Sequence, residues 1–229
     1  MVACFRKKEM LLMKFDAVIF DLDGTLLNTL GDLRNAVNHA LSTFGLPPRT
    51  LEEVRAFVGN GVANLIRRAM PAGSSEETLA QALTAFRAYY NAHLNVETVP
   101  YPGVISMLKD LKAAGLPVMV NSNKYDAALQ ELVKCHFPNL YFRAAGESDA
   151  CPRKPDPTAA LTLARAAGAA PEKTLYVGDS AVDVNTARNA GMSCAWVSWG
   201  FRSREDMASD LPKAAFDTTQ ALADYILGR

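Results

Sequence analysis

The sequence lacks an excess charge of either sign, a dense set of cysteines and any long apolar run. Its 229 residues carry 24 Lys and Arg against 24 Asp and Glu, and this balance gives no sign of a surface for nucleic acid or anionic membranes. The four cysteines are scattered and fit neither a disulfide framework nor a paired metal motif, so we interpret them as reduced thiols. No apolar run approaches the ~20 residues that a membrane helix requires. We therefore expect a soluble, cytoplasmic protein that binds neither nucleic acid nor membrane.

Residues 1–13 differ from the rest of the chain. Three basic residues, Arg6, Lys7 and Lys8, precede an apolar stretch that is too short for a secretory signal and ends at Lys14. We expect a disordered leader here, or translation that begins at Met13.

Short apolar runs alternate with helical stretches rich in alanine or leucine. Buried strands are predicted at residues 15–20, 116–120, 175–177 and 194–197. Helices are predicted at residues 104–114, 127–134, 158–167 and 181–190. Strands that alternate with helices indicate βαβ units and a parallel sheet.

One segment, from about residue 30 to residue 96, has helical pattern without a strand. Helices are predicted there at residues 32–44, 51–58, 62–69 and 75–94. We therefore expect an α/β fold: a three-layered parallel-sheet core with an inserted α-helical cap. The predicted core comprises residues 14–29 and 99–229, and the predicted cap comprises residues 30–98.

Two carboxylates follow the first predicted strand, in Asp21-Leu22-Asp23-Gly24. Open parallel sheets bind ligands beyond the carboxyl ends of their strands. Strand alternation places Asp21 and Asp23 on the same side, and Gly24 allows a tight turn beside a ligand. On its own, the motif is equally typical of an Asp-Gly turn with solvated carboxylates.

Three further polar clusters lie at or between the ends of later strands. Residues 121–124 (Asn-Ser-Asn-Lys) follow one strand, and Gly178-Asp179-Ser180 follows another, with Asp183 one helical turn beyond Asp179. Lys154 lies between these clusters in a proline-rich loop. Each cluster alone is commonly a turn, a helix cap or a surface lysine, but the four together indicate an active site.

This set of motifs resembles the four motifs of haloacid dehalogenase-like hydrolases and extends over nearly the whole chain. The matching elements are DLDGT at residues 21–25, Ser122, Lys154 and GDSAVD at residues 178–183. Within that family the likeness is greatest to bacterial phosphoglycolate phosphatases, through residues 58–61, 122–124 and 199–203. The family's usual threonine before Asn-Lys is Ser122 here, which keeps the hydroxyl.

The resemblance implies a Rossmann-like core and Mg²⁺-dependent hydrolysis of a small-molecule phosphate ester, most closely 2-phosphoglycolate, through an aspartyl-phosphate. In this family pattern Asp21 is the nucleophile and a metal ligand. Asp23 protonates the leaving alcohol, later activates water, and ligates the metal through its main-chain carbonyl. An acid at Asp23 also disfavours the halide-displacing members of the family.

The resemblance also implies binding roles for other residues. Ser122 and Lys154 bind the phosphoryl group, and Asn123 adds a turn amide. Asp179 is a metal ligand and Asp183 supports the metal shell. In the predicted cap, the amides of Gly59, Asn60 and Gly61 at a helix N-terminus suit the second anionic group of a small acid. Gly24 completes the substrate-binding set.

Several alternatives share these core residues. A phosphomutase acting on a hexose phosphate, a pyrophosphatase and a non-catalytic binding module remain open. Phosphonate cleavage through a cap lysine is excluded because the chain has no lysine between Lys14 and Lys109. We expect a monomer or a weak homodimer.

Overall fold

The computed structural model describes residues 13–229, so all of the predicted leader except Met13 lies outside the described residues. Its main sheet has six parallel strands in the order β5-β4-β1-β6-β7-β8. The strands are β1 (Ala17–Phe20), β4 (Val118–Tyr125), β5 (Arg143–Glu147), β6 (Thr174–Gly178), β7 (Ser193–Val197) and β8 (Ala214–Phe216). The predicted α/β fold class is therefore confirmed.

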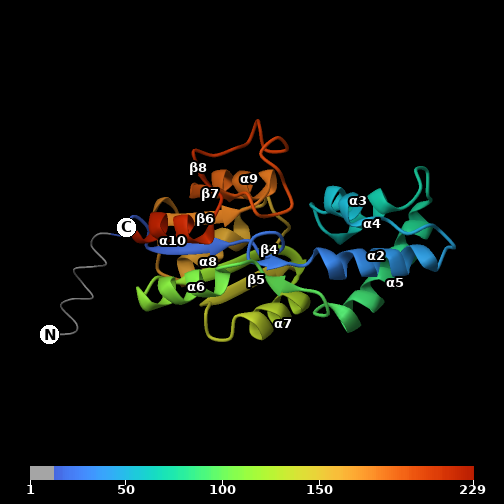
Figure 1. Ribbon diagram of the computed structural model, residues 1–229, viewed down its shortest axis with the longest axis horizontal. Coiled ribbons are helices and arrows are strands. Elements are labelled where there is room, and N and C mark those ends of the chain that lie inside the picture. The colour runs from blue at the N-terminus through green and yellow to red at the C-terminus, as the bar shows by residue number, and fades with distance from the viewer. Residues whose placement is uncertain (1–12) are drawn as a thin grey trace.

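Helices cover both faces of this sheet and make three layers (Figure 1). The helices of the core are α6 (Val104–Ala113), α7 (Asp126–His136), α8 (Thr158–Ala166), α9 (Ala181–Asn189) and α10 (Thr219–Leu227). Val18 and Phe20 of β1 pack with the face that α6, α7 and α10 cover, whereas Ala17 and Ile19 pack against α8 and α9. Because both faces are buried, β1 is a continuous apolar run rather than an alternating one.

Four further helices form a separate group at one end of the molecule, which we name the helical insert (Figure 1). They are α2 (Leu30–Ser42), α3 (Leu51–Phe57), α4 (Val62–Ala69) and α5 (Glu76–His93). Local signals start two of them: Thr50 and Glu53 form a capping box on α3, and the Ser75 side chain caps α5. A small antiparallel pair, β2 (Leu27–Asn28) with β3 (Val99–Pro100), joins the insert to the core. No helix among residues 13–229 is long and apolar enough to cross a membrane.

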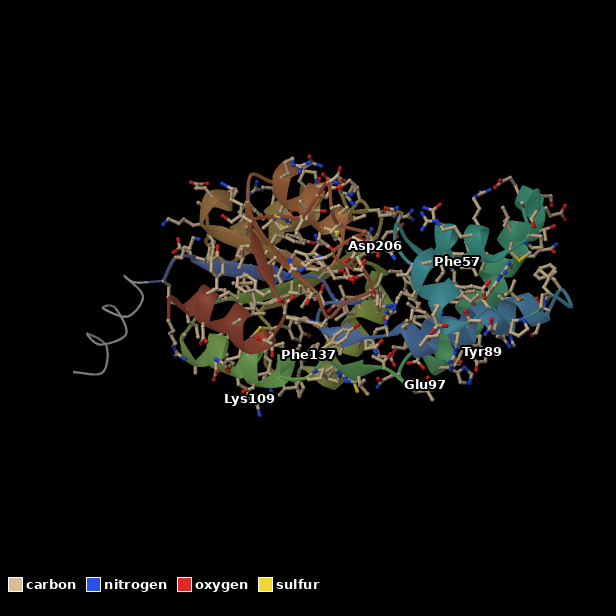
Figure 2. All side chains as sticks on the ribbon, turned by 45° about the horizontal axis from the view of Figure 1, so that its top comes forward. Phe57, Tyr89, Glu97, Lys109, Phe137 and Asp206 are labelled. Carbon is tan, nitrogen blue, oxygen red and sulfur yellow. The ribbon has the colours of Figure 1, made fainter. Side chains whose placement is uncertain are left out.

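Asp32 ties the two ends of the helical insert together. Its carboxylate accepts hydrogen bonds from the backbone N–H groups of Val96, Glu97 and Thr98 at 2.9–3.1 Å, and from Thr98 Oγ1 at 2.7 Å. Figure 2 shows Glu97 at this crossing, between the insert that carries Phe57 and Tyr89 and the core that carries Lys109 and Phe137.

We expect Asp32→Ala to lower the free energy of unfolding by about 3 kcal/mol, because backbone donors are left without their anionic acceptor. Urea denaturation measures this change, with the wild type and the variant fitted to one shared m-value, the slope of the unfolding free energy against urea concentration. Asp149→Ala, at an exposed carboxylate, is the control and should stay within ~0.5 kcal/mol of the wild type. Equal stability of the two variants would contradict the anchoring role.

Candidate active site

The carboxyl ends of three neighbouring strands meet at one edge of the sheet. Phe20 of β1 is in register with Val120 of β4 and Val177 of β6, so the residues that follow each of them lie side by side. Residues 121–124 were expected as a turn, but they continue β4 as far as Tyr125. The strand continues through an irregular pairing with β5, whose register shifts between Asn121 and Tyr125.

Three carboxylates from two of these strand ends and helix α9 form a buried acidic cluster. One oxygen from each of Asp21, Asp179 and Asp183 lies within 4.8 Å of the others, and all three side chains are buried. Burial raises the pKa of Asp21 well above its usual range, although Lys154 opposes the shift. Burial and then the charge of Asp183 raise the pKa of Asp179 to about 7.

The cluster fits a divalent cation such as Mg²⁺. Its donors are hard carboxylate oxygens, and three of them, all from buried side chains, come within 4.8 Å of one another. Gly24 has φ +87°, and a Cβ on it would lie 2.5 Å from Asp179 Oδ2. The glycine therefore lets the backbone approach Asp179. Asp21 and Asp179 are the residues that would hold the cation.

Lys154 places its charge inside this cluster. Its Nζ lies 2.8 Å from Asp21 Oδ1 and 2.7 Å from Asp183 Oδ1. The Asn123 side chain accepts from Lys154 N–H at 2.7 Å and donates to Lys154 O at 3.3 Å, so it holds the lysine loop. The other oxygen of Asp183 accepts from Ser180 N–H and Ser180 Oγ.

Asp23 stands apart from the acidic cluster and has its own partners. Its Oδ1 accepts from Thr29 Oγ1 at 2.6 Å and lies 3.0 Å from Lys124 Nζ. Ser122 Oγ donates to its Oδ2 at 3.3 Å. The sequence analysis missed Thr29 and Lys124 as site residues. A signal for Lys124 was present, because residues two apart on a strand face the same side and Ser122 was already assigned.

The helical insert closes the other side of the pocket that contains Asp21 and Asp23. Gly59, Asn60 and Gly61 line it and have positive φ values of 119°, 60° and 81°. The Asn60 carbonyl accepts from Arg153 Nη1 at 3.0 Å, which fixes this loop to the core. Arg202, which also lines the pocket, donates to the carbonyls of Arg55 and Val58. Arg153 and Arg202 join loops that are distant in sequence. The sequence analysis included Arg202 within residues 199–203 but assigned no role to either side chain.

Known proteins match this chain in both sequence and fold. A model of the family described as haloacid dehalogenase-like hydrolase matches residues 18–197. A protein named phosphoglycolate phosphatase 1 from Pseudomonas aeruginosa is 38% identical over 212 residues, which cover 90% of this chain and 77% of that protein. A phosphoglycolate phosphatase from Psychrobacter arcticus is 32% identical over 218 residues, covering 92% and 95% of the two chains.

A crystal structure from Lactobacillus delbrueckii subsp. bulgaricus, provisionally named a phosphoglycolate phosphatase, superposes with a TM-score of 0.90 at 33% identity. The match covers 95% of this chain and 100% of that one. Sequence motifs, strand order and the convergence of the acidic residues agree with these similarities. This chain therefore belongs to the haloacid dehalogenase-like hydrolases and is a phosphoric monoester hydrolase.

Proposed function

We propose that this enzyme hydrolyses 2-phosphoglycolate through an aspartyl-phosphate on Asp21, with Mg²⁺ as cofactor. The observation that carries the proposal is the separation of two carboxylates with different surroundings. Asp21 lies in the acidic cluster beside Lys154, whereas Asp23 is held outside it by Thr29 and Lys124. One carboxylate is thereby arranged for attack and the other for proton transfer.

Attack by Asp21 on a phosphate dianion meets electrostatic repulsion. At ~4 Å and an effective dielectric constant of ~20, each pair of unit charges costs ~4 kcal/mol. Lys154 lies 2.8 Å from the nucleophile and offsets part of this repulsion. When bound, Mg²⁺ supplies further positive charge beside the phosphoryl oxygens. In this proposal Ser122, close to Asp23, donates to the phosphoryl group.

Asp23 completes both chemical steps. It donates a proton to the alcohol oxygen as the bond to phosphorus breaks and Asp21 becomes phosphorylated. It then takes a proton from the water that attacks the aspartyl-phosphate, which releases inorganic phosphate and restores Asp21. Residues 30–98 act as the cap that excludes bulk water during these steps, on a core of residues 14–29 and 99–229.

The pocket also offers a place for the carboxylate of the substrate. Three cations from the described part of the chain line it: Lys124, Lys154 and Arg202. The two lysines each have a carboxylate within ion-pair distance, whereas the contacts of Arg202 are backbone carbonyls. Arg202 thus retains charge and N–H donors for an anion. Together with the amides of residues 59–61, it favours a small phosphorylated acid.

We expect 2-phosphoglycolate to be turned over with a higher kcat/KM than hexose phosphates, nucleotides or pyrophosphate. The measurement is phosphate release across these substrates with Mg²⁺, repeated with Gly59→Trp, which places bulk beside Arg202. The variant should lose 2-phosphoglycolate turnover. Preference for a hexose phosphate, or its isomerisation without phosphate release, would refute this substrate and favour the mutase.

A second pair of variants tests the carboxylate contact. Arg202→Met should lower kcat/KM for 2-phosphoglycolate by about 10- to 100-fold, the effect of a lost charged hydrogen bond, and spare ethyl phosphate. Arg204→Met is the matched control, since Arg204 is exposed and pairs with Asp217. Equal losses on both substrates would show that Arg202 only holds the insert against the core.

A further inference from the structure

A buried lysine links the helical insert to Asp23. Lys124 Nζ lies 3.0 Å from Asp23 Oδ1 and donates to Tyr90 Oη at 2.8 Å. Tyr90 belongs to α5 of the insert, whereas Lys124 belongs to β4 of the core. Both side chains are buried, with exposed fractions of 1% for Tyr90 and 6% for Lys124. A cation so deeply buried requires partners, and these are the two that the structure provides.

The protonation states of this pair are defined by its surroundings. Burial alone lowers the pKa of Lys124, but Asp23 and Tyr90 raise it above the usual range, so the amine is an ammonium. Burial raises the pKa of Tyr90 to about 12, so its hydroxyl is neutral and accepts from the lysine. The two contacts, 3.0 Å to Asp23 Oδ1 and 2.8 Å to Tyr90 Oη, hold the Lys124 amine in one place as a cationic contact to Asp23.

The contacts distinguish the two oxygens of Asp23. Oδ1 accepts a hydrogen bond from Thr29 Oγ1 at 2.6 Å and forms an ion pair with Lys124 Nζ at 3.0 Å, and both are strong contacts. Oδ2 receives only the longer 3.3 Å hydrogen bond from Ser122. Turning the carboxylate plane away from this orientation would break both contacts on Oδ1, so they hold the side chain at one angle. Oδ2 is thus the oxygen left for the substrate.

We propose that Lys124, held by Tyr90 of α5, is a positioning residue that keeps Asp23 Oδ2 directed at the leaving oxygen of the substrate. Proton donation by Asp23 then depends on the insert lying against the core. This inference rests on the proposed function, in which Asp23 donates the proton to the departing alcohol. It assigns Lys124 and Tyr90 to that step rather than to phosphate binding.

Leaving-group dependence tests this role. An alkyl alcohol needs a proton as it departs, whereas 2,4-dinitrophenolate does not. With Mg²⁺ present, Lys124→Met should lower kcat/KM by roughly 10²-fold for the best alkyl phosphate substrate of the wild type, and far less for 2,4-dinitrophenyl phosphate. Because kcat/KM reports the first irreversible step, a slow breakdown of the aspartyl-phosphate does not obscure the comparison. Equal losses on both substrates would overturn the inference, since they indicate phosphate binding or folding.

Tyr90→Phe tests the contact from the insert and keeps the buried ring. It should show the same selective loss, about tenfold, because one hydrogen bond to a charged group is removed. Tyr89→Phe is the matched control: this neighbouring ring stacks between His39 and His93, at centroid distances of 4.4 and 4.1 Å. If Lys124→Met does not fold, Tyr90→Phe decides, and an unselective or absent effect overturns the inference.

Asp23→Asn separates this inference from the proposed function. If Asp23→Asn loses alkyl phosphate turnover selectively and neither Lys124→Met nor Tyr90→Phe does, the positioning role is wrong and the general acid stands. If Asp23→Asn itself shows no selectivity for the leaving group, the general acid of the proposed function fails, and the positioning role fails with it.

Discussion

Asp21→Asn is expected to lower kcat by at least ~10⁴-fold, the scale seen when an enzyme loses its nucleophile. An amide is a poor nucleophile towards phosphorus and cannot form the aspartyl-phosphate. The fold should survive, because burial already raises the pKa of Asp21 and a neutral group of the same shape is tolerated there. Lys154 also keeps Asp183 as a partner at 2.7 Å.

Steady-state phosphate release and thermal unfolding measure the two parts of this prediction. Asp16→Asn is the matched control, since Asp16 is exposed immediately before the same strand and should leave activity unchanged. Trapping with beryllofluoride, followed by structure determination, should place the phosphoryl mimic on Asp21. Wild-type release of phosphate by Asp21→Asn would show that the nucleophile lies elsewhere.

Removal of divalent cations is expected to abolish activity, and Ca²⁺ is expected to inhibit. Asp21, Asp179 and Asp183 bring oxygens within 4.8 Å of one another, with one nearby lysine to offset their charge. Ca²⁺ is larger than Mg²⁺ and takes more oxygen ligands, which would engage the nucleophile. Full activity after exhaustive chelation with EDTA would refute the metal requirement.

Thermal unfolding gives a second readout that does not depend on activity. A cation that binds only the folded state at 100 times its Kd stabilises it by ~2.7 kcal/mol, so Mg²⁺ should raise Tm by several degrees. Asp179→Ala should lose this shift together with turnover. An undiminished Mg²⁺ shift in Asp179→Ala would place the cation away from this carboxylate.

Local pattern was sufficient for the elements at the centre of the fold. β1 and β6 are short apolar runs because both faces of each are buried, and such runs are visible in sequence. The edge strands β5 and β8 were missed. Their sequences, RAAGE and AAF, are only partly buried and carry little of the apolar signal that marks a central strand. Their assignment depends on pairing with β4 and β7, which are distant in the chain.

The active-site motifs were readable because each is a short segment at a strand end. Asp21, Asp23, Ser122 and Asp179 were located from their neighbours in sequence and from the rule that parallel strands present ligands at one edge. Their roles came from the resemblance to haloacid dehalogenase-like hydrolases. The boundaries of the cap, residues 30–98, and the roles of Gly59 and Asn60 stay predictions.

The sequence by itself determined the fold class, the family and the set of acidic residues, because periodicity and short motifs are local properties. Only the tertiary structure decided how the charges pair. It places Lys154 between Asp21 and Asp183, and Lys124 between Asp23 and Tyr90. Both lysines follow polar residues in loops or strand ends and look alike in sequence. Their partners lie far away along the chain, and the energy of a buried charge depends on which groups surround it in space.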